Sequence, residues 1–220
     1  MRLMTVSASA ERLGVSTRQV QHLVARGDLR QVARGVIDEA SIDRLLATRG
    51  GSRTRAWTEA TAWGAVSLLS GGSADWMGQT QRSRLRARLR AVSATDLVAQ
   101  TRERARVTRY RAHSSAERYL RDILVRATTR GEEFGLTATN AVDGYLAAQD
   151  VANAVRHHGL IRDDEGRVTL RATSMELGLV ADLANRGPVL AALGLGESLD
   201  VRERRAGLEA LDRALEAFRG

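Results

Sequence analysis

The chain contains no cysteine, so it cannot form a disulfide bond or bind a metal ion through thiolates. Its four histidines are scattered along the sequence, which argues against a zinc site. We therefore predict that the protein holds no metal ion and needs no cofactor.

Long apolar segments are also missing. No run of 18 apolar residues occurs, and the N-terminus lacks the pattern of a signal peptide. We therefore expect a soluble, cytoplasmic protein that does not enter a membrane. With 43% hydrophobic residues most of the chain should fold, and 220 residues allow one large domain or two to three small ones.

Lysine is the third absence, since every one of the 34 basic residues is arginine. Mutational bias in a GC-rich genome is the simplest cause, so the distribution of arginine is more informative than its number. Residues 1–55 carry 10 Arg against 5 acidic residues, residues 56–125 carry 12 against 6, and residues 126–220 carry 12 against 15. The basic front suits contact with phosphate groups, and the mildly acidic back suits a protein partner.

Residues 5–38 carry the clearest pattern in the chain. A short helix is expected over 7–13. Gly14 suits the left-handed position that ends a helix, and Ser16 can cap the start of the next one. Ser16 and Gln19 together have the S-x-x-Q spacing of a capping box.

The second helix, from Ser16 to Arg26, has an apolar side and a polar side. Val20, Leu23 and Val24 share the apolar face at helical spacing. A recognition helix needs such a face to hold it to its domain, and long donors and acceptors on the other side to reach the major groove. The side chains that we assign to DNA contact here are Ser16, Thr17, Arg18, Gln19, Gln21, His22 and Arg26.

A hairpin should follow this helix. Gly27-Asp28 turns the chain, and strands are expected over 29–33 and 36–37 around a tight tip at Arg34-Gly35. Arg30 and Arg34 are placed to contact phosphates.

The whole stretch resembles the excisionase-like, MerR-type winged helix-turn-helix family, over about the first fifth of the chain. The residues that carry the resemblance are Ala8-x-Ala10-Glu11-Arg12-Leu13-Gly14-Val15-Ser16, Arg18-x-Val20, Leu23-Val24 and Gly27-x-Leu29. The resemblance implies that this module is a DNA-binding domain.

Two further basic segments are candidates for contact with DNA. Residues 49–55 form a Gly-, Ser- and Arg-rich linker, in which Arg53 and Arg55 either follow the DNA backbone or belong to a solvated hinge. Residues 79–91 are expected to form a helix with a narrow stripe of Leu85 and Leu89 between arginines. Arg82 and Arg86 of this helix either contact nucleic acid or lie on a solvated face.

No arrangement typical of an enzyme occurs. Gly72-Ser73 is compatible with the opening of a nucleotidyltransferase site, but only Asp75 is nearby and the required D-x-D pair of metal-binding carboxylates is absent. Gly194-x-Gly196 lacks the third glycine and the preceding strand of a dinucleotide site. The acids Asp163, Asp164 and Glu165 lack the spacing of a calcium loop, so we expect them at a solvated hairpin tip.

The rest of the chain predicts a mainly α protein with short β-hairpins, in the α+β class. A helix over 148–158 followed by a hairpin over 160–172 predicts a second unit like a winged helix. We divide the chain into a winged helix-turn-helix domain at 1–49, a linker at 50–56, an α+β domain at 57–175 and a C-terminal helical segment at 176–220.

Beyond the first module, the chain resembles actinobacterial relatives of the AbiEi-type antitoxins of type IV toxin–antitoxin pairs. The residues that carry this resemblance are Arg55-Ala56-Trp57 with Trp63, Arg82-x-Arg84-Leu85-Arg86-x-Arg88-Leu89, Arg109-Tyr110-Arg111-x-His113, Asp143-Gly144-Tyr145-Leu146, Val168-x-Leu170-Arg171 and Glu197-Ser198-x-Asp200-x-Arg202-x-Arg204. The resemblance implies a protein that neutralises a nucleotidyltransferase-type toxin or regulates its gene, and that binds inverted repeats upstream of its own operon. The usual member has a general winged helix at its N-terminus, whereas the module here is closer to the excisionase and MerR type.

Two functions therefore compete. The first is a sequence-specific DNA-binding transcriptional regulator, an autorepressing antitoxin, and not an enzyme. Since one helix-turn-helix reads only a few base pairs, its partner is double-stranded DNA bound by a homodimer or with a second contact domain. The second is a protein-interaction module that neutralises a partner toxin, suggested by the acidic back and an apolar stripe over 208–218 that can also pack within the chain.

Overall fold

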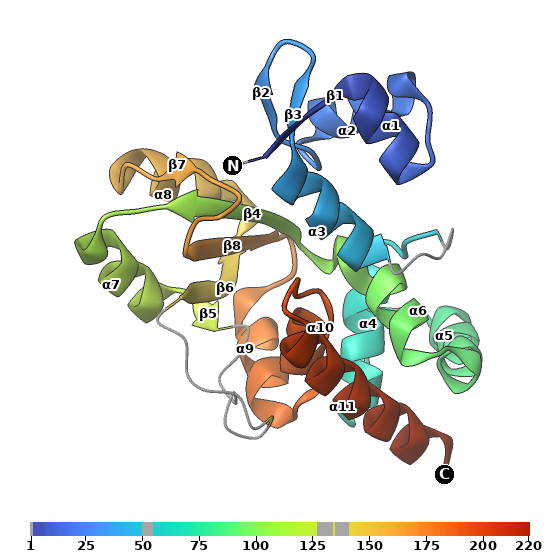
Figure 1. Ribbon diagram of the computed structural model, residues 1–220. Coiled ribbons are helices and arrows are strands. Elements are labelled where there is room, and N and C mark those ends of the chain that lie inside the picture. The colour runs from blue at the N-terminus through green and yellow to red at the C-terminus, as the bar shows by residue number, and fades with distance from the viewer. Residues whose placement is uncertain (1, 50–54, 127–133, 135–140) are drawn as a thin grey trace.

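The computed structural model describes residues 2–49, 55–126, 134 and 141–220 (Figure 1). Within these ranges the chain forms eleven α-helices and two small sheets, which is consistent with the predicted α+β class. Its hydrophobic residues form three separate clusters, one in each of three packed layers of structure.

The first layer is an N-terminal unit of three helices and a small sheet. Its strands pair antiparallel in the order β1-β3-β2. Its core contains Val20, Leu23, Leu29, Ile37 and Ile42, each at most 1% exposed. The elements are β1 (Leu3–Thr5), α1 (Val6–Leu13), α2 (Thr17–Arg26), β2 (Gln31–Ala33), β3 (Val36–Asp38) and α3 (Glu39–Arg49).

The turn between α1 and α2 has the predicted chemistry. Gly14 lies in the left-handed region at φ 63°, and its N–H donates to the last carbonyls of α1. The Ser16 hydroxyl accepts a hydrogen bond from the Gln19 N–H at 3.2 Å, and so caps α2. Gly27 ends α2 in the same left-handed conformation, at φ 79°.

The second layer is a bundle of helices. Trp63, Leu97, Leu190, Leu211 and Leu215 are fully buried in its core. Thus the C-terminal segment expected at 176–220 shares one core with the helices that precede the sheet. The elements are α4 (Glu59–Leu69), α5 (Gln79–Ala91), α6 (Ala94–Thr101), η1 (Arg102–Arg104), α9 (Leu177–Arg186), α10 (Val189–Gly196) and α11 (Val201–Arg219).

The third layer is a five-stranded mixed sheet in the order β5-β6-β8-β4-β7. Strands β6 and β8 run parallel, and the other neighbours are antiparallel. Figure 1 shows α7 and α8 beside this sheet, away from the bundle. The elements are β4 (Arg106–Arg111), α7 (Ser114–Ile123), β5 (Val125–Arg126), β6 (Val142–Ala147), η3 (Ala148–Asp150), α8 (Val151–His157), β7 (Ile161–Arg162) and β8 (Val168–Thr173).

The predicted hairpin over 160–172 is wrong. Both β7 and β8 pair with β4, which lies between them, and β8 pairs on its other side with β6. The alternating pattern of these residues correctly indicated strands. It did not contain the information that a strand 50 residues earlier would be inserted between them.

A buried ionic cluster joins the sheet to the bundle. Glu197, just after α10, lies between Arg104 and Arg171 and forms an ion pair with each. Arg171 also binds Asp143 through two nitrogens, at 2.7 and 2.9 Å. Burial alone would raise the pKa of Glu197, but the two guanidinium charges outweigh it and hold that pKa below its ordinary value.

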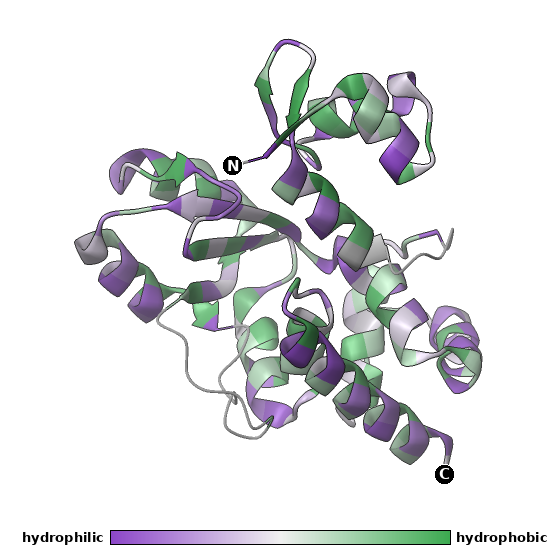
Figure 2. Cartoon of the chain, viewed as in Figure 1, coloured by the Kyte–Doolittle hydropathy of each residue, from purple (hydrophilic) through white to green (hydrophobic). Residues whose placement is uncertain are grey.

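The apolar stripe of α11 is used inside the chain. Leu211 and Leu215 are fully buried, and Leu208 and Phe218 pack against the same core from partly buried positions. Figure 2 shows the corresponding alternation of hydrophilic and hydrophobic residues along α11. The stripe is therefore not an exposed apolar face, which the protein-interaction hypothesis partly required.

Candidate nucleic-acid interface

Helix α2 presents a polar face to solvent. Thr17, Arg18, Gln19, Gln21 and His22 are all exposed. The opposite face is anchored, because Val20 and Leu23 are 0% and 1% exposed in the core of the N-terminal unit. These five predicted site residues therefore lie on one accessible surface, next to the exposed cap residue Ser16.

The β2–β3 hairpin projects beside this helix (Figure 1). Its tip is the predicted pair, with Arg34 exposed and Gly35 in the left-handed region at φ 79°. Among the described residues, Arg34 has no ion-pair partner, so its guanidinium is available to a ligand.

Arg26 and Arg30, also predicted to contact DNA, have acidic partners within the protein. Arg26 pairs with Asp28 at 3.2 Å and with Glu103 at 3.1 Å. Arg30 lies 3.5 Å from Asp38 and 3.7 Å from Asp163. These two residues lie at the junction between the N-terminal unit and the rest of the chain.

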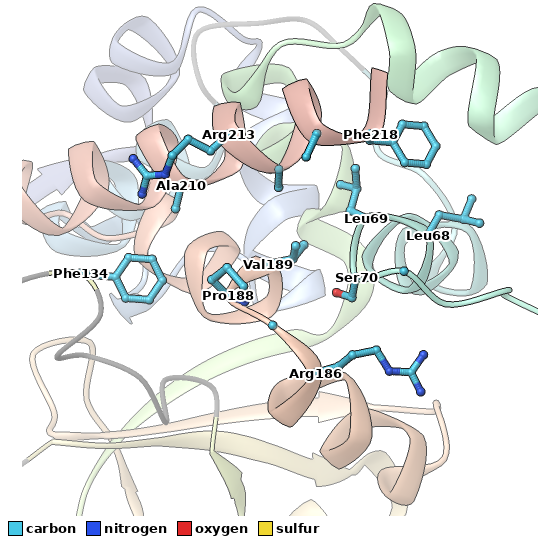
Figure 3. A pocket seen from close by; sticks show the side chains of 14 residues that line it. Leu68, Leu69, Ser70, Phe134, Arg186, Pro188, Val189, Ala210, Arg213 and Phe218 are labelled. Atoms are coloured by element: carbon cyan, nitrogen blue, oxygen red, sulfur yellow. The ribbon is translucent and has the colours of Figure 1, made fainter. Parts of the chain in front are cut away.

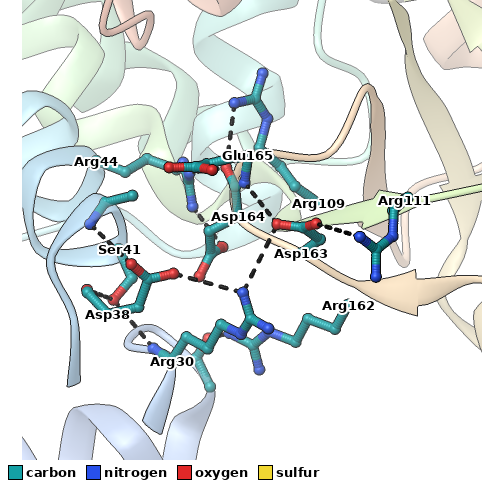
Figure 4. Close-up of polar contacts among 12 residues, drawn as sticks. Arg30, Asp38, Ser41, Arg44, Arg109, Arg111, Arg162, Asp163, Asp164 and Glu165 are labelled. Carbon is teal, nitrogen blue, oxygen red and sulfur yellow. Dashed lines mark hydrogen bonds and ion pairs between the residues drawn. The ribbon is translucent and has the colours of Figure 1, made fainter. Parts of the chain in front are cut away.

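The junction is a dense set of polar contacts that the sequence did not indicate (Figure 4). Arg44 of α3 forms an ion pair with Asp164. Arg106 donates to the Arg26 carbonyl at 3.0 Å, and Arg162 donates to the Gly27 carbonyl at 2.9 Å. The C-terminal end of α2 is thus held by side chains from β4 and β7.

The acidic turn at 163–165 therefore differs from the solvated hairpin tip that we predicted. Asp164 is 4% exposed, and its carboxylate faces Arg44. Burial and the nearby charge of Arg44 lower the pKa of Arg109, which donates to the Asp164 carbonyl at 3.4 Å. The sequence around the turn does not indicate that Asp164 is buried, because its partner Arg44 lies 120 residues earlier in the chain.

Helix α5 has the predicted bounds and the predicted stripe. Leu85 and Leu89 are buried against α4 and α11, while Arg84, Arg86 and Arg88 are exposed. Arg82 pairs with Asp75 at 2.8 Å and donates to the Ser73 carbonyl at 3.3 Å. Arg86 is therefore freer than Arg82 to meet a phosphate. Of the linker residues, Arg55 is exposed and Arg53 lies outside the described residues.

Neither metal-binding clusters nor membrane-spanning helices occur in the part of the chain that the structure describes. No three of its His, Asp and Glu side chains gather closely enough to hold a metal ion. Each of its helices is too short or too polar to cross a bilayer.

Comparison with known proteins adds no assignment. No protein-family model matches the chain, and neither a curated protein nor a solved structure is significantly similar to it. Any function must therefore be argued from the residues and their geometry.

Proposed function

We propose that this protein is a sequence-specific DNA-binding transcriptional regulator, and that residues 1–49 are its winged helix-turn-helix. The observation that carries the proposal is the exposed face of α2. Five adjacent polar side chains lie on the accessible side of a short helix that is capped at both ends and anchored by its apolar side. An exposed arginine at the tip of the neighbouring hairpin supports the same reading.

The side chains of α2 have the chemistry that base recognition requires. In the major groove an arginine binds the N7 and O6 atoms of guanine, and a glutamine binds the N6 and N7 atoms of adenine. Arg18, Gln21 and His22 would read base edges from the first turns of α2. Arg34 on the hairpin would contact the phosphate backbone, which positions the protein without specifying a sequence.

A second contact is needed, because one such helix reads only a few base pairs. The exposed arginines of α5 and a second copy of the chain are the two candidates for it. Arginine side chains that lie on both sides of a buried leucine stripe present their charges to solvent, where phosphates are accessible.

The test begins with selection of binding sites from a pool of randomised DNA duplexes, followed by gel-shift titration of the selected sequence. We expect one enriched motif. Arg18→Ala with His22→Ala should relax the motif, with each lost base contact costing about 1–3 kcal/mol. Arg202→Ala, an exposed arginine of α11, is the matched control and should bind as the wild type does. No enrichment, or equal binding by the double variant, would refute α2 as the reading helix.

The salt dependence separates phosphate contact from base contact. Arg34→Ala should weaken binding to all sequences and should lower the slope of log K against log salt by about one. A variant that changed sequence preference without changing the slope would place Arg34 in a groove instead of on the backbone.

The antitoxin role stays a prediction that rests on resemblance. Its alternative, a protein-interaction module that neutralises a toxin, predicts a stable complex with the product of an adjacent gene. Co-purification of that product with the full chain and with a variant lacking residues 1–49 would test it, because the second possible function needs no DNA-binding unit.

A further inference from the structure

A cavity of about 560 Å³ lies in the helical bundle, far along the chain from the N-terminal unit (Figure 3). It is bounded by the end of α4, the junction of α9 and α10, and the outer turns of α11. Cavities of about 300–1,000 Å³ are typical of sites for small organic molecules.

Much of the cavity wall is apolar. Leu69 of α4, Val189 of α10, and Ala214 and Phe218 of α11 line it, and all four are at least partly buried. Such walls would favour an aliphatic or aromatic body by removing it from water.

The described residues that line the cavity carry charge of one sign. Among them are Arg186 and Arg213, and neither an aspartate nor a glutamate. Among the described residues, neither arginine has an ion-pair partner. Figure 3 shows the two side chains on opposite sides of the α10 start at Pro188.

One neutral polar group at the cavity also lacks a partner. The Ser70 Oγ atom is buried and has no hydrogen-bond partner within the described residues. The Arg186 guanidinium lies close to Gly72, two residues after Ser70 in the chain. Helix α10 begins at the cavity without a side-chain cap or an acidic residue in its first turn, so its first N–H groups add positive potential.

We propose that this cavity binds a small amphipathic anion: a molecule with an apolar aliphatic or aromatic body and one carboxylate, sulfonate or similar group. The apolar walls take the body. Arg186, Ser70 and the start of α10 take the charged group, and Arg213 adds positive charge from the other side. The site is independent of the N-terminal unit, so it does not depend on the proposed DNA binding.

A pair of fluorescent probes tests the proposal on the full chain. 8-Anilinonaphthalene-1-sulfonate is an aromatic anion, and N-phenyl-1-naphthylamine has the same rings without the sulfonate. We expect saturable binding of the anion to one site, and binding of the neutral probe weaker by about tenfold, the effect of one charge-assisted contact.

Four variants place the binding. Arg186 and Arg213 are both exposed. Each of the variants Arg186→Gln and Arg213→Gln should lower the affinity for the anionic probe several-fold and change the affinity for the neutral probe by less than about twofold. Ala217→Trp, which fills the mouth from an exposed position on α11, should abolish binding of both. Arg202→Gln, on the same helix but outside the cavity, should change neither.

Two results would overturn the proposal. Equal affinity for the two probes would show that the cavity does not recognise a negative charge. Unchanged binding by Ala217→Trp, in a variant whose circular dichroism and melting temperature match the wild type, would place the probe elsewhere on the molecule.

Discussion

Loss of the Glu197 carboxylate should destabilise the protein strongly. It pairs with Arg104 and Arg171, which are 1% and 5% exposed, so its removal would leave Arg104 buried without a carboxylate partner and Arg171 with Asp143 alone. Breaking a buried pair by removing one partner costs about 3–5 kcal/mol. We expect Glu197→Gln to lower the free energy of unfolding by about that amount in urea titrations.

The matched control for this change is Glu209→Gln. Glu209 pairs with Arg205 on the exposed side of α11, where both side chains are more than half exposed. Since surface pairs contribute little, we expect a change below about 1 kcal/mol. A similar loss in the two variants would mean that the Glu197 cluster is solvated in solution.

The same carboxylate predicts a pH dependence. Its pKa in the folded protein is below the ordinary value of 4.5, so it binds protons less readily folded than unfolded. Its stabilising contribution is therefore fully present above that ordinary value and is lost as the pH falls through the lower, folded pKa. The stability difference between wild type and Glu197→Gln should be constant at neutral pH and should shrink below pH 4.5. Unfolding free energies measured from pH 7 to pH 3 would check this, and a constant difference would contradict it.

The buried charged residues could not be predicted from the sequence. In the sequence, nothing distinguishes the buried charged residues from the exposed ones around them. The residue types and the local spacing are the same. The buried residues are Arg104, Asp164, Arg171 and Glu197. Their burial follows from strands and helices that meet across about 25 to 120 residues of chain. No local pattern distinguishes a buried charge of this kind, because its partner is chosen by the fold.

At the scale of elements, α10 and α11 depend on a close approach at Gly207. A Cβ atom at this position would lie 2.6 Å from both the Ala192 carbonyl oxygen and the Gly196 nitrogen. Both are backbone atoms, so the helices would have to separate. We expect Gly207→Ala to destabilise the protein by about 1–3 kcal/mol, the range for overpacking, and to lower its melting temperature.

Gly78→Ala is the control for this substitution. Gly78 has a φ of −63°, which any residue adopts, and a Cβ there would meet nothing within 4 Å. The melting temperature of the Gly78→Ala variant should stay close to that of the wild type. If Gly207→Ala were equally mild, the close contact between α10 and α11 would not be present in solution.

Elements defined by local chemistry could be predicted, and their pairing could not. The bounds of α5 and the caps of α2 follow from residues within one or two turns. The polar face of α2 belongs to this group, because a period of 3.6 places its residues on one side whatever the fold. The order of the five strands and the cavity between α4, α9, α10 and α11 depend on contacts between distant segments, for which the sequence had no signal.

For the whole molecule, the junction decides whether the N-terminal unit moves as an independent body. Side chains of β4 and β7 hold the C-terminal carbonyls of α2, and α3 is joined to the 163–165 turn. The orientation of α2 is therefore coupled to the sheet. If α2 reads DNA, the same contacts would determine how a second contact on α5 is positioned relative to it.

The last prediction concerns the strength of this coupling, through Arg44 and Asp164. Asp164 is 4% exposed and pairs with Arg44. Arg44→Gln would leave this carboxylate buried without its charge partner, and Asp164→Asn would remove the partner of Arg44. Each of these two variants should therefore lower the free energy of unfolding. Because Arg44 has further contacts, a double-mutant cycle with Asp164→Asn is needed to isolate the pair, and we expect a coupling energy of about 1–3 kcal/mol. Hydrogen exchange should quicken in β2, β3 and α3 of either variant while the amides of α10 stay protected, since local opening need not involve the bundle. Zero coupling energy with unchanged exchange would mean that the Arg44–Asp164 pair does not hold α3 to the 163–165 turn, and that the remaining contacts of the junction alone orient the N-terminal unit.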